Sequence, residues 1–295
     1  MRNDNKPCKR AYPSFSSQAG RSKLLQQLDA QRKQYSRSWR HNANAHHAQG
    51  HYDWMAAQVA GHPRTLEIGC GVGHSTLALL KNGHQVVCVE ENLHCISATQ
   101  LLLSEHGFSV AVIERSTAHS LDEASYRLDY AAIVDAPRAD CLIIEGDALK
   151  DPQLERWLKT QPVFDSVACW LIGTHLLRAR NVLLDAALIT TPLDYRVQVQ
   201  HNVYALADAV LRAGGILNVI DREPTPSTQR IYASILASHR DQARGSSLDV
   251  GSLSYTPQLE TPCAETMQLL EHTAQALGHE GPLTFSLCSV TSVKH

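Results

Sequence analysis

Three glycines at alternate positions follow a short apolar segment and precede a helical pattern. They are Gly69, Gly71 and Gly73, within the stretch from Thr65 to Ser75. Glycine permits positive φ and a close approach of ligand to backbone, and the first turn of a helix presents unpaired N–H groups that favour an anion. The pattern therefore predicts a nucleotide site at a strand–turn–helix junction. A tight connection without any ligand is the alternative.

The glycine spacing differs by one residue from that of a dinucleotide site. Such a site has Gly-x-Gly-x-x-Gly, and His74 stands where its third glycine belongs, which disfavours NAD and FAD. An acid, Glu90, ends the next apolar segment at the offset of about twenty residues typical of a ribose-binding carboxylate. A carboxylate there can accept hydrogen bonds from both ribose hydroxyls. It would repel a 2′-phosphate, which disfavours NADP. A solvated acid at a strand end is the alternative.

A third apolar segment, Cys141 to Glu145, runs into Gly146, Asp147 and Ala148. In this order the segments resemble the class I S-adenosylmethionine-dependent methyltransferases, in which these places hold the glycine-rich first motif, the acid after the second strand and the segment around the adenine. The resemblance implies S-adenosylmethionine as the cofactor. For Asp147, a helix N-cap is the alternative role. The residues assigned to the cofactor are Glu67, Gly69, Gly71, Gly73, Glu90, Asp147, Ala148 and Cys169.

Two later segments extend the resemblance to about residues 50–222. The stretch Phe164 to His175 looks like the fourth strand with its active-site segment, and Gly214 to Asp221 looks like the fifth strand. Ligands of such sheets lie beyond the carboxyl ends of the strands, so the reacting residues should follow these two. His175 is the predicted catalytic base, because an imidazole pKa near 6.5 suits proton removal at neutral pH. A histidine at a helix start without a chemical role is the alternative.

Four further residues are candidates for substrate contact. Trp170 could line the site of an aromatic or cationic substrate, and its alternative role is that of a core tryptophan. Asp221 could orient a polar substrate, and its alternative role is that of a surface ion pair. His47 and His51 share a helix face as paired metal ligands do, but no Glu or Cys nearby completes a set, so no metal is predicted. The resemblance implies a lid before the first strand, which places His51 and Tyr52 at the substrate or the methionine end.

The elements that must position these residues predict an α/β fold. We expect a doubly wound, mostly parallel seven-stranded sheet with helices on both faces, an N-terminal helical extension and an inserted hairpin. The chain divides into a basic arm and helix over 1–50 and a methyltransferase domain over 51–295. The insertion covers about 108–139, with short strands at 108–113 and 130–134, and either covers the site, binds a partner or is ornamental. The final strand, over 282–293, should be antiparallel at the sheet edge. Helices are expected at 23–35, 51–59, 76–81, 93–106, 151–159, 197–212, 226–240 and 265–277, and a sixth strand at 253–256.

Charge and cysteine usage narrow the class of protein. The net charge of −2 argues against a nucleic-acid binder that acts through its overall charge, but residues 1–40 carry ten Lys and Arg against two Asp. That arm is either a solvated leader or a phosphate-contacting segment. The eight cysteines include no Cys-x-x-Cys pair, which favours a reducing compartment. No apolar run approaches the roughly 18 residues of a membrane span and no secretory signal is evident, so we expect a cytoplasmic protein without membrane contact.

These observations predict a methyltransferase that acts on a small-molecule O or N acceptor. The alternatives are an RNA methyltransferase guided by the basic arm and a non-catalytic binding protein on the same fold. Methyltransferases of adenine or glutamine nitrogens often have Asn or Asp followed by Pro-Pro-Tyr after the fourth strand. Here the run is Cys169 to His175, without the acid, the amide or the prolines, which disfavours that chemistry. The sequence does not predict the oligomeric state.

Overall fold

The computed structural model describes residues 22–259 and 284–295. The described helices are α1 (Lys23–Ala48), α2 (His51–Ala57), α3 (His74–Lys81), α4 (Leu93–Glu105), α5 (Pro152–Thr160), the 3-10 helix η2 (Leu176–Arg180), α6 (Pro192–Val210) and α7 (Gln229–Gln242). The described strands are β1 (Arg64–Ile68), β2 (Gln85–Glu90), β3 (Val110–Ile113), β4 (Ser116–Ser120), β5 (Tyr126–Tyr130), β6 (Cys141–Glu145), β7 (Phe164–Trp170), β8 (Leu211–Pro224), β9 (Leu248–Pro257) and β10 (Phe285–Lys294).

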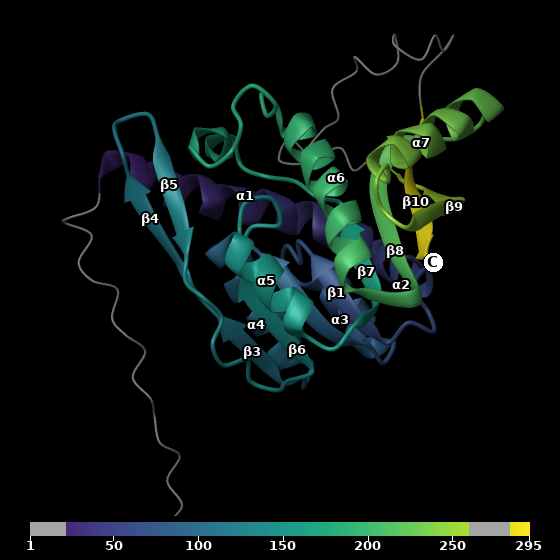
Figure 1. The fold of residues 1–295 in the computed structure, drawn as a ribbon, viewed down its shortest axis with the longest axis horizontal. Coiled ribbons are helices and arrows are strands. Elements are labelled where there is room, and N and C mark those ends of the chain that lie inside the picture. Colours follow the sequence, from purple (N-terminus) through teal and green to yellow (C-terminus); the bar gives the residue numbers. More distant parts are fainter. Residues whose placement is uncertain (1–21, 260–283) are drawn as a thin grey trace, which may run out of the picture.

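One sheet of eight strands forms the centre of the molecule (Figure 1). Its order is β3-β6-β2-β1-β7-β8-β10-β9, and β10 runs antiparallel to both of its neighbours while the other pairings are parallel. From β1 the chain winds outward through β2 to β3 at the edge, and β6 then takes the place between β2 and β3. From β7 it winds the other way through β8. The direction therefore reverses between β1 and β7, which is where doubly wound sheets bind their ligands.

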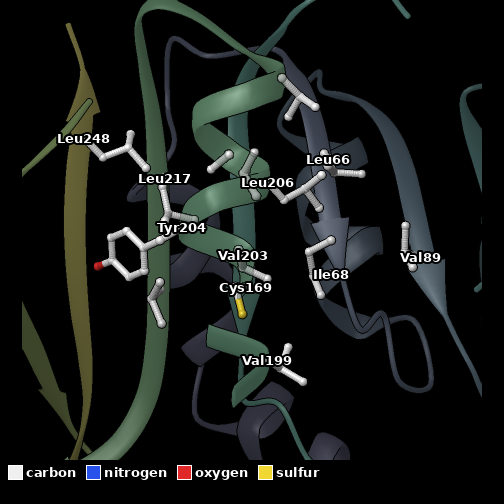
Figure 2. Packing of buried hydrophobic residues seen from close by; sticks show 14 of the residues in the cluster. Leu66, Ile68, Val89, Cys169, Val199, Val203, Tyr204, Leu206, Leu217 and Leu248 are labelled. Atoms are coloured by element: carbon white, nitrogen blue, oxygen red, sulfur yellow. The ribbon is translucent and has the colours of Figure 1, made fainter. Parts of the chain in front are cut away.

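Side chains alternate between two apolar layers, so helices cover both faces of the sheet. Residues such as Leu66 and Ile68 face α5, α6 and α7, whereas Cys88 and Ala168 face α2, α3 and α4. Figure 2 shows the first layer, in which Val199, Val203 and Leu206 of α6 lie over strand residues. These two layers hold the carboxyl ends of the central strands at a common level, since Ile68 pairs with Val89 on one side and with Cys169 on the other.

The sheet has one strand more than predicted, and the inserted hairpin lies elsewhere. Residues 110–113 join the sheet as β3, parallel to β6, because the outer edge of β6 is free to accept an apolar, β-branched segment. The hairpin is β4–β5, and the predicted strand at 130–134 extends only to Tyr130. Arg115 fixes the point at which the chain leaves β3 for the hairpin. Its backbone N–H donates to the Glu145 carboxylate at 2.6 Å, and its guanidinium pairs with Asp151.

Two other expectations differ from the structure. Helix α1 continues to Ala48, well past the predicted end at residue 35, because no glycine or proline interrupts it before Gln49 and Gly50. The final strand is antiparallel as expected, but β9 pairs along its outer side and takes the edge position. The predicted helix at 265–277 lies outside the described residues.

Candidate functional site

The turn between β1 and α3 adopts the backbone that its glycines predicted. Gly69, Gly71 and Gly73 have φ of 77°, 53° and 93°, all in the left-handed region. A Cβ added at Gly71 would lie 2.7 Å from Trp39 Cδ1, and one at Gly73 would lie 2.9 Å from the Thr99 Cα of α4. Gly69 and Gly71 line a cavity, but Gly73 does not. The third glycine is therefore needed for packing between the turn and α4.

That cavity lies beyond the carboxyl ends of β1, β2, β6 and β7, and its volume is about 50 Å³. Of the predicted cofactor residues, Gly69, Gly71, Glu90, Asp147 and Ala148 meet there. Residues outside the predicted cofactor set complete the wall: Tyr35, Trp39, Ile68, Val89, Glu91, Asn92, Gly146, Leu171, Ile172, Gly173, Thr174, Tyr195 and Val199. Four separate strand ends thus contribute to one site.

Glu90 presents a carboxylate to this cavity. Its Oε2 accepts a hydrogen bond from the Gly71 N–H at 3.1 Å and its Oε1 accepts one from the Asn92 N–H at 3.0 Å. Burial, reinforced by the charge of Glu91, raises the pKa of Glu90 to about 7. Both oxygens keep further lone pairs, so the group can accept hydrogen bonds from a diol.

Asp147 and Ala148 form the end of the cavity beyond β6. Asp147 Oδ1 accepts the Leu149 N–H at 2.9 Å, and its Oδ2 pairs with the Arg178 guanidinium. The N-cap of α5 is Asp151, whose carboxylate accepts a hydrogen bond from the Leu154 N–H. Asp147 is therefore not the N-cap of this helix. Arg178 leaves Asp147 only part of its hydrogen-bonding capacity for a ligand.

Glu67 lies away from the cavity. The side chain faces α3, where it accepts hydrogen bonds from the Ser75 hydroxyl at 2.5 Å and the Thr76 hydroxyl at 2.7 Å. Burial raises its pKa even though these bonds and one from the Cys88 thiol oppose the shift. In this structure Glu67 ties the start of α3 to the sheet, and it reaches the glycine turn only through that helix.

A buried ion-pair network surrounds Glu91. Its Oε2 lies 2.7 Å from Arg32 Nη2 of α1 and 3.4 Å from Arg178 Nη1 of η2, and its Oε1 lies 3.2 Å from His175 Nε2. Burial alone would raise the pKa of Glu91, but Arg32 and Arg178 hold it well below its ordinary value. This network was not predicted from the sequence. Its one local signal is the doubled acid at the end of β2.

The segment after β7 lines the cavity with residues other than those predicted. Leu171, at φ 53°, begins the turn, and residues 171–174 form the wall. Cys169 is fully buried under α6, while the Trp170 indole N–H points to the other face and donates to Asn218 Oδ1 at 2.7 Å. His175 is only 4% exposed and turns toward Glu91. None of Cys169, Trp170 and His175 lines the cavity.

The other three predicted substrate residues also lie outside the cavity wall. His51 is buried between His46, at 2.9 Å between the Nδ1 atoms, and the Pro257 carbonyl, at 3.1 Å from Nε2. Tyr52 stacks on His74 with ring centroids 5.6 Å apart. Asp221 accepts hydrogen bonds from Arg196 and Gln200, both at 2.8 Å.

The aromatic part of the wall comes from Tyr35 and Trp39 of α1 and Tyr195 of α6. Tyr35 and Trp39 are four residues apart and therefore share one face of α1. This spacing was the signal available in the sequence. The spacing shows that the two side chains share a face of α1. It does not show that this face covers a cavity, because the strand ends that α1 contacts lie far along the chain.

Strand order, the antiparallel position of β10 and the glycine turn together define the fold of the class I S-adenosylmethionine-dependent methyltransferases, with β3 as an added edge strand. No protein-family model and no curated protein sequence matches the chain.

Solved structures match the chain at low similarity. The magnesium protoporphyrin IX methyltransferase ChlM from Synechocystis PCC 6803, with bound SAM, is 13% identical with a TM-score of 0.40, over 94% of this chain and 86% of that one. The N-methyltransferase NodS from Bradyrhizobium japonicum WM9, in complex with S-adenosyl-L-homocysteine, is 10% identical with a TM-score of 0.42, over 82% and 86%. The [4+2]-cyclase SpnF is 13% identical with a TM-score of 0.43, over 82% and 80%. At this level these structures indicate no substrate or reaction for this chain.

Two kinds of feature are absent from the described residues. Within residues 22–259 and 284–295, no group of three His, Cys, Asp or Glu side chains is arranged to hold a metal ion. No helix in the same ranges is long and apolar enough to cross a membrane.

Proposed function

We propose that this protein is an S-adenosylmethionine-dependent methyltransferase that acts on a small-molecule O or N acceptor. The observation that carries the proposal is the meeting of Gly69, Gly71, Glu90 and the Asp147–Ala148 segment at one cavity, from three strand ends. The residue types fit the cofactor: a carboxylate for the ribose diol, glycine backbone for close approach and a polar turn for the adenine.

S-adenosylmethionine would supply an electrophilic methyl group, and the residues of the chain would position the acceptor. Glu90 would accept the ribose hydroxyls, and the backbone of Gly69 and Gly71 would lie against the cofactor. Residues 171–174, with Tyr195, would surround the acceptor and exclude water from it. The exclusion of water strengthens every electrostatic interaction inside the site. An apolar and aromatic wall of this kind supports a small acceptor over a polymer.

We assign no proton transfer to His175 in this arrangement. The imidazole lies 3.2 Å from the Glu91 carboxylate and outside the cavity, so we propose that it positions the segment after β7. Trp170 and Asp221 would likewise support the acceptor wall from behind. Asp221 does so by holding Arg196 and Gln200 of α6, the helix that presents Tyr195 and Val199 to the cavity.

The alternative of an RNA acceptor rests on the basic N-terminal arm. Arg32, one of its ten basic residues, is buried in the pair with Glu91 and cannot contact phosphate in this arrangement. We keep residue 50 as the boundary between this extension and the domain. The six cysteines of the described ranges are free and buried, which supports a reducing, cytoplasmic location.

Titration calorimetry with S-adenosyl-L-homocysteine tests the donor site. We expect one binding site in the wild type and a loss of affinity of at least about tenfold, or about 1.4 kcal/mol, in Glu90→Ala. Glu155→Ala, which removes an exposed acid of α5 paired with Lys159, is the matched control and should bind as the wild type does. No binding by the folded wild type at millimolar ligand would overturn the proposal.

A further inference from the structure

A second cavity lies under the hairpin β4–β5, apart from the cavity described above, which we call the donor cavity. Its volume is about 370 Å³, and it falls within the roughly 300–1,000 Å³ of pockets that enclose small molecules. The two cavities share no lining residue, and none of the residues predicted to bind donor or acceptor lies in the second. Strand β5, the start of α5 and the segment after η2 supply its wall: Arg127, Leu128, Asp129, Tyr130, Lys150, Asp151, Pro152, Gln153 and Leu183.

The apolar part of this wall comes from three separate segments. Tyr130 ends β5, Pro152 begins α5 and Leu183 follows η2, so a ligand between them would contact all three segments. The hairpin is held in place from its other side, because the side chain of Leu128 is fully buried and packs with Leu28 of α1. Figure 1 shows α1 beside the hairpin. The cavity is therefore formed in the folded chain without a ligand.

The carboxylates of the wall already have partners. Both oxygens of Asp151 accept hydrogen bonds from the Arg115 guanidinium. Asp129 accepts one from Arg127 Nε at 2.7 Å, and its other oxygen lies 3.6 Å from His119 Nε2. Each negative charge of the wall thus lies against a positive one, and the two carboxylates leave little capacity to bind a cation.

Hydrogen-bond donors of the wall remain available. Lys150 is exposed, and within residues 22–259 and 284–295 no carboxylate pairs with it. Arg127 gives only its Nε to Asp129, which leaves both Nη groups. The Gln153 Oε1 accepts a hydrogen bond from Arg156 at 3.2 Å, which leaves the amide N–H groups of Gln153 to donate. Three side chains therefore offer donors and one positive charge is uncompensated, so a ligand with anionic oxygens complements the wall.

The position of the second cavity separates its ligand from the methyl acceptor. Lys150 lies three residues after Asp147 and two after Ala148, the segment of the donor cavity assigned to the adenine. Residues 171–174, which would surround the acceptor, line the donor cavity and not the second one. A molecule under the hairpin would thus lie past the adenine segment as a second ligand.

We propose that the second cavity binds a small organic anion, which carries a carboxylate or phosphate group on an apolar body. The anionic oxygens face Lys150 and Gln153, and the body packs between Tyr130 and Leu183. The inserted hairpin then has the role of one wall of a binding site. The assignment does not depend on the donor, because neither the hairpin nor Lys150 belongs to the donor cavity.

Amide NMR of the full chain, without a methyl donor, tests the site with phenylacetate as the probe. We expect saturable shifts of the amides of 127–130 and of Leu183, with the amides of Gly69 and Gly71 unchanged. Phenylacetamide, the neutral isostere, should bind at least about threefold more weakly, as expected for an exposed charge. Phenyl phosphate tests the other headgroup, and whichever of the two acids binds more tightly identifies it. Inorganic phosphate, which lacks the apolar body, should bind more weakly than phenyl phosphate.

Two variants place the probe in this cavity. Lys150→Met keeps the length of the side chain without its charge, so it should weaken phenylacetate at least about threefold and leave phenylacetamide unchanged. Lys159→Met, at an exposed lysine of α5 that pairs with Glu155 outside the cavity, is the matched control and should bind as the wild type does. Leu183→Trp should fill the cavity and abolish the shifts of 127–130 while the remaining amide spectrum shows a folded protein.

Three results would overturn the site. The first is the absence of saturable shifts at millimolar phenylacetate or phenyl phosphate. The second is equal binding of phenylacetate and phenylacetamide, which would leave the charge of Lys150 without a role. The third is a set of shifts at Gly69 and Gly71 but not at 127–130, which would place the probe in the donor cavity.

Discussion

The turn after β1 and the segment after β7 leave neighbouring strands at the same edge of the sheet, yet they build the cavity by different means. The turn contributes backbone held at positive φ by Gly69 and Gly71, so its role depends on residues that are adjacent in the chain. The segment after β7 contributes the wall at 171–174. It also turns His175 toward Glu91, 84 residues away in sequence, and Arg178 toward Asp147, 31 residues away. A local backbone requirement can be predicted from sequence. Whether a side chain with remote partners has a catalytic or a positioning role cannot be read from the sequence around it.

The strongest test of this difference is Arg178→Met. Arg178 is 1% exposed and pairs with Asp147 and Glu91, so its removal leaves Asp147 as a buried carboxylate without its cation. We expect a loss of about 3–5 kcal/mol in the free energy of unfolding, measured by chemical denaturation. Glu155→Gln, at the exposed pair with Lys159, should change it by less than about 0.5 kcal/mol. A loss below 1 kcal/mol would show that Arg178 is a free side chain near the site.

The corresponding test of the turn is Gly73→Ala. At φ 93° a Cβ is strained by about 1–2 kcal/mol, and here it would also meet the Thr99 backbone at 2.9 Å. We expect a destabilisation of about 3 kcal/mol in all, again by chemical denaturation. Gly107→Ala is the matched control, since Gly107 has φ 83° and nothing within 4 Å, and should cost about 1 kcal/mol. Equal losses in the two variants would mean that the packing against α4 contributes nothing.

The same distinction explains how much could be predicted from the sequence. The strands of the central sheet, most of the helices and the meeting of Gly69, Gly71, Glu90 and Asp147 follow from period, glycine and strand-end acids, which are local signals. The hairpin strands β4 and β5 were not predicted at their positions. The place of β3 depends on which sheet edge is free, and the burial of His51 depends on the position of His46 and Pro257. The side chain of Glu67 faces α3, because successive residues of a strand point to opposite faces of the sheet, and the glycine pattern does not show which face Glu67 takes.

The pH dependence of donor binding sharpens the role of Glu90. Its pKa is raised from 4.5 to about 7, so the carboxyl is largely protonated in the free protein below pH 7. If the ionised form binds the ribose diol, affinity for S-adenosyl-L-homocysteine should fall about tenfold per pH unit, or about 1.4 kcal/mol, below pH 7. In Glu90→Gln calorimetry should find weaker binding without this slope. An unchanged slope in the variant would assign the titration to another group.

The folding stability should respond to Glu90 with the opposite sign. A raised pKa favours the folded state below pH 4.5, and that contribution is lost as pH rises through about 7. Glu90→Gln should therefore be more stable than the wild type at pH 8 while it binds the donor less well. A variant that loses both stability and affinity at pH 8 would make Glu90 a structural residue.

The smallest expected effect comes from Trp170→Phe. The indole N–H donates to Asn218 Oδ1 in the core, while the Asn218 amide N–H groups donate to the Ser289 and Thr291 hydroxyls. Removal of the indole N–H leaves one buried acceptor without its donor and should cost about 1 kcal/mol in the free energy of unfolding, with donor affinity unchanged. Asn218→Ala in combination separates the pair from its surroundings in a double-mutant cycle. A loss of acceptor binding at full stability would instead show that Trp170 contacts the substrate. A side chain predicted from the sequence would then act directly at the end of β7.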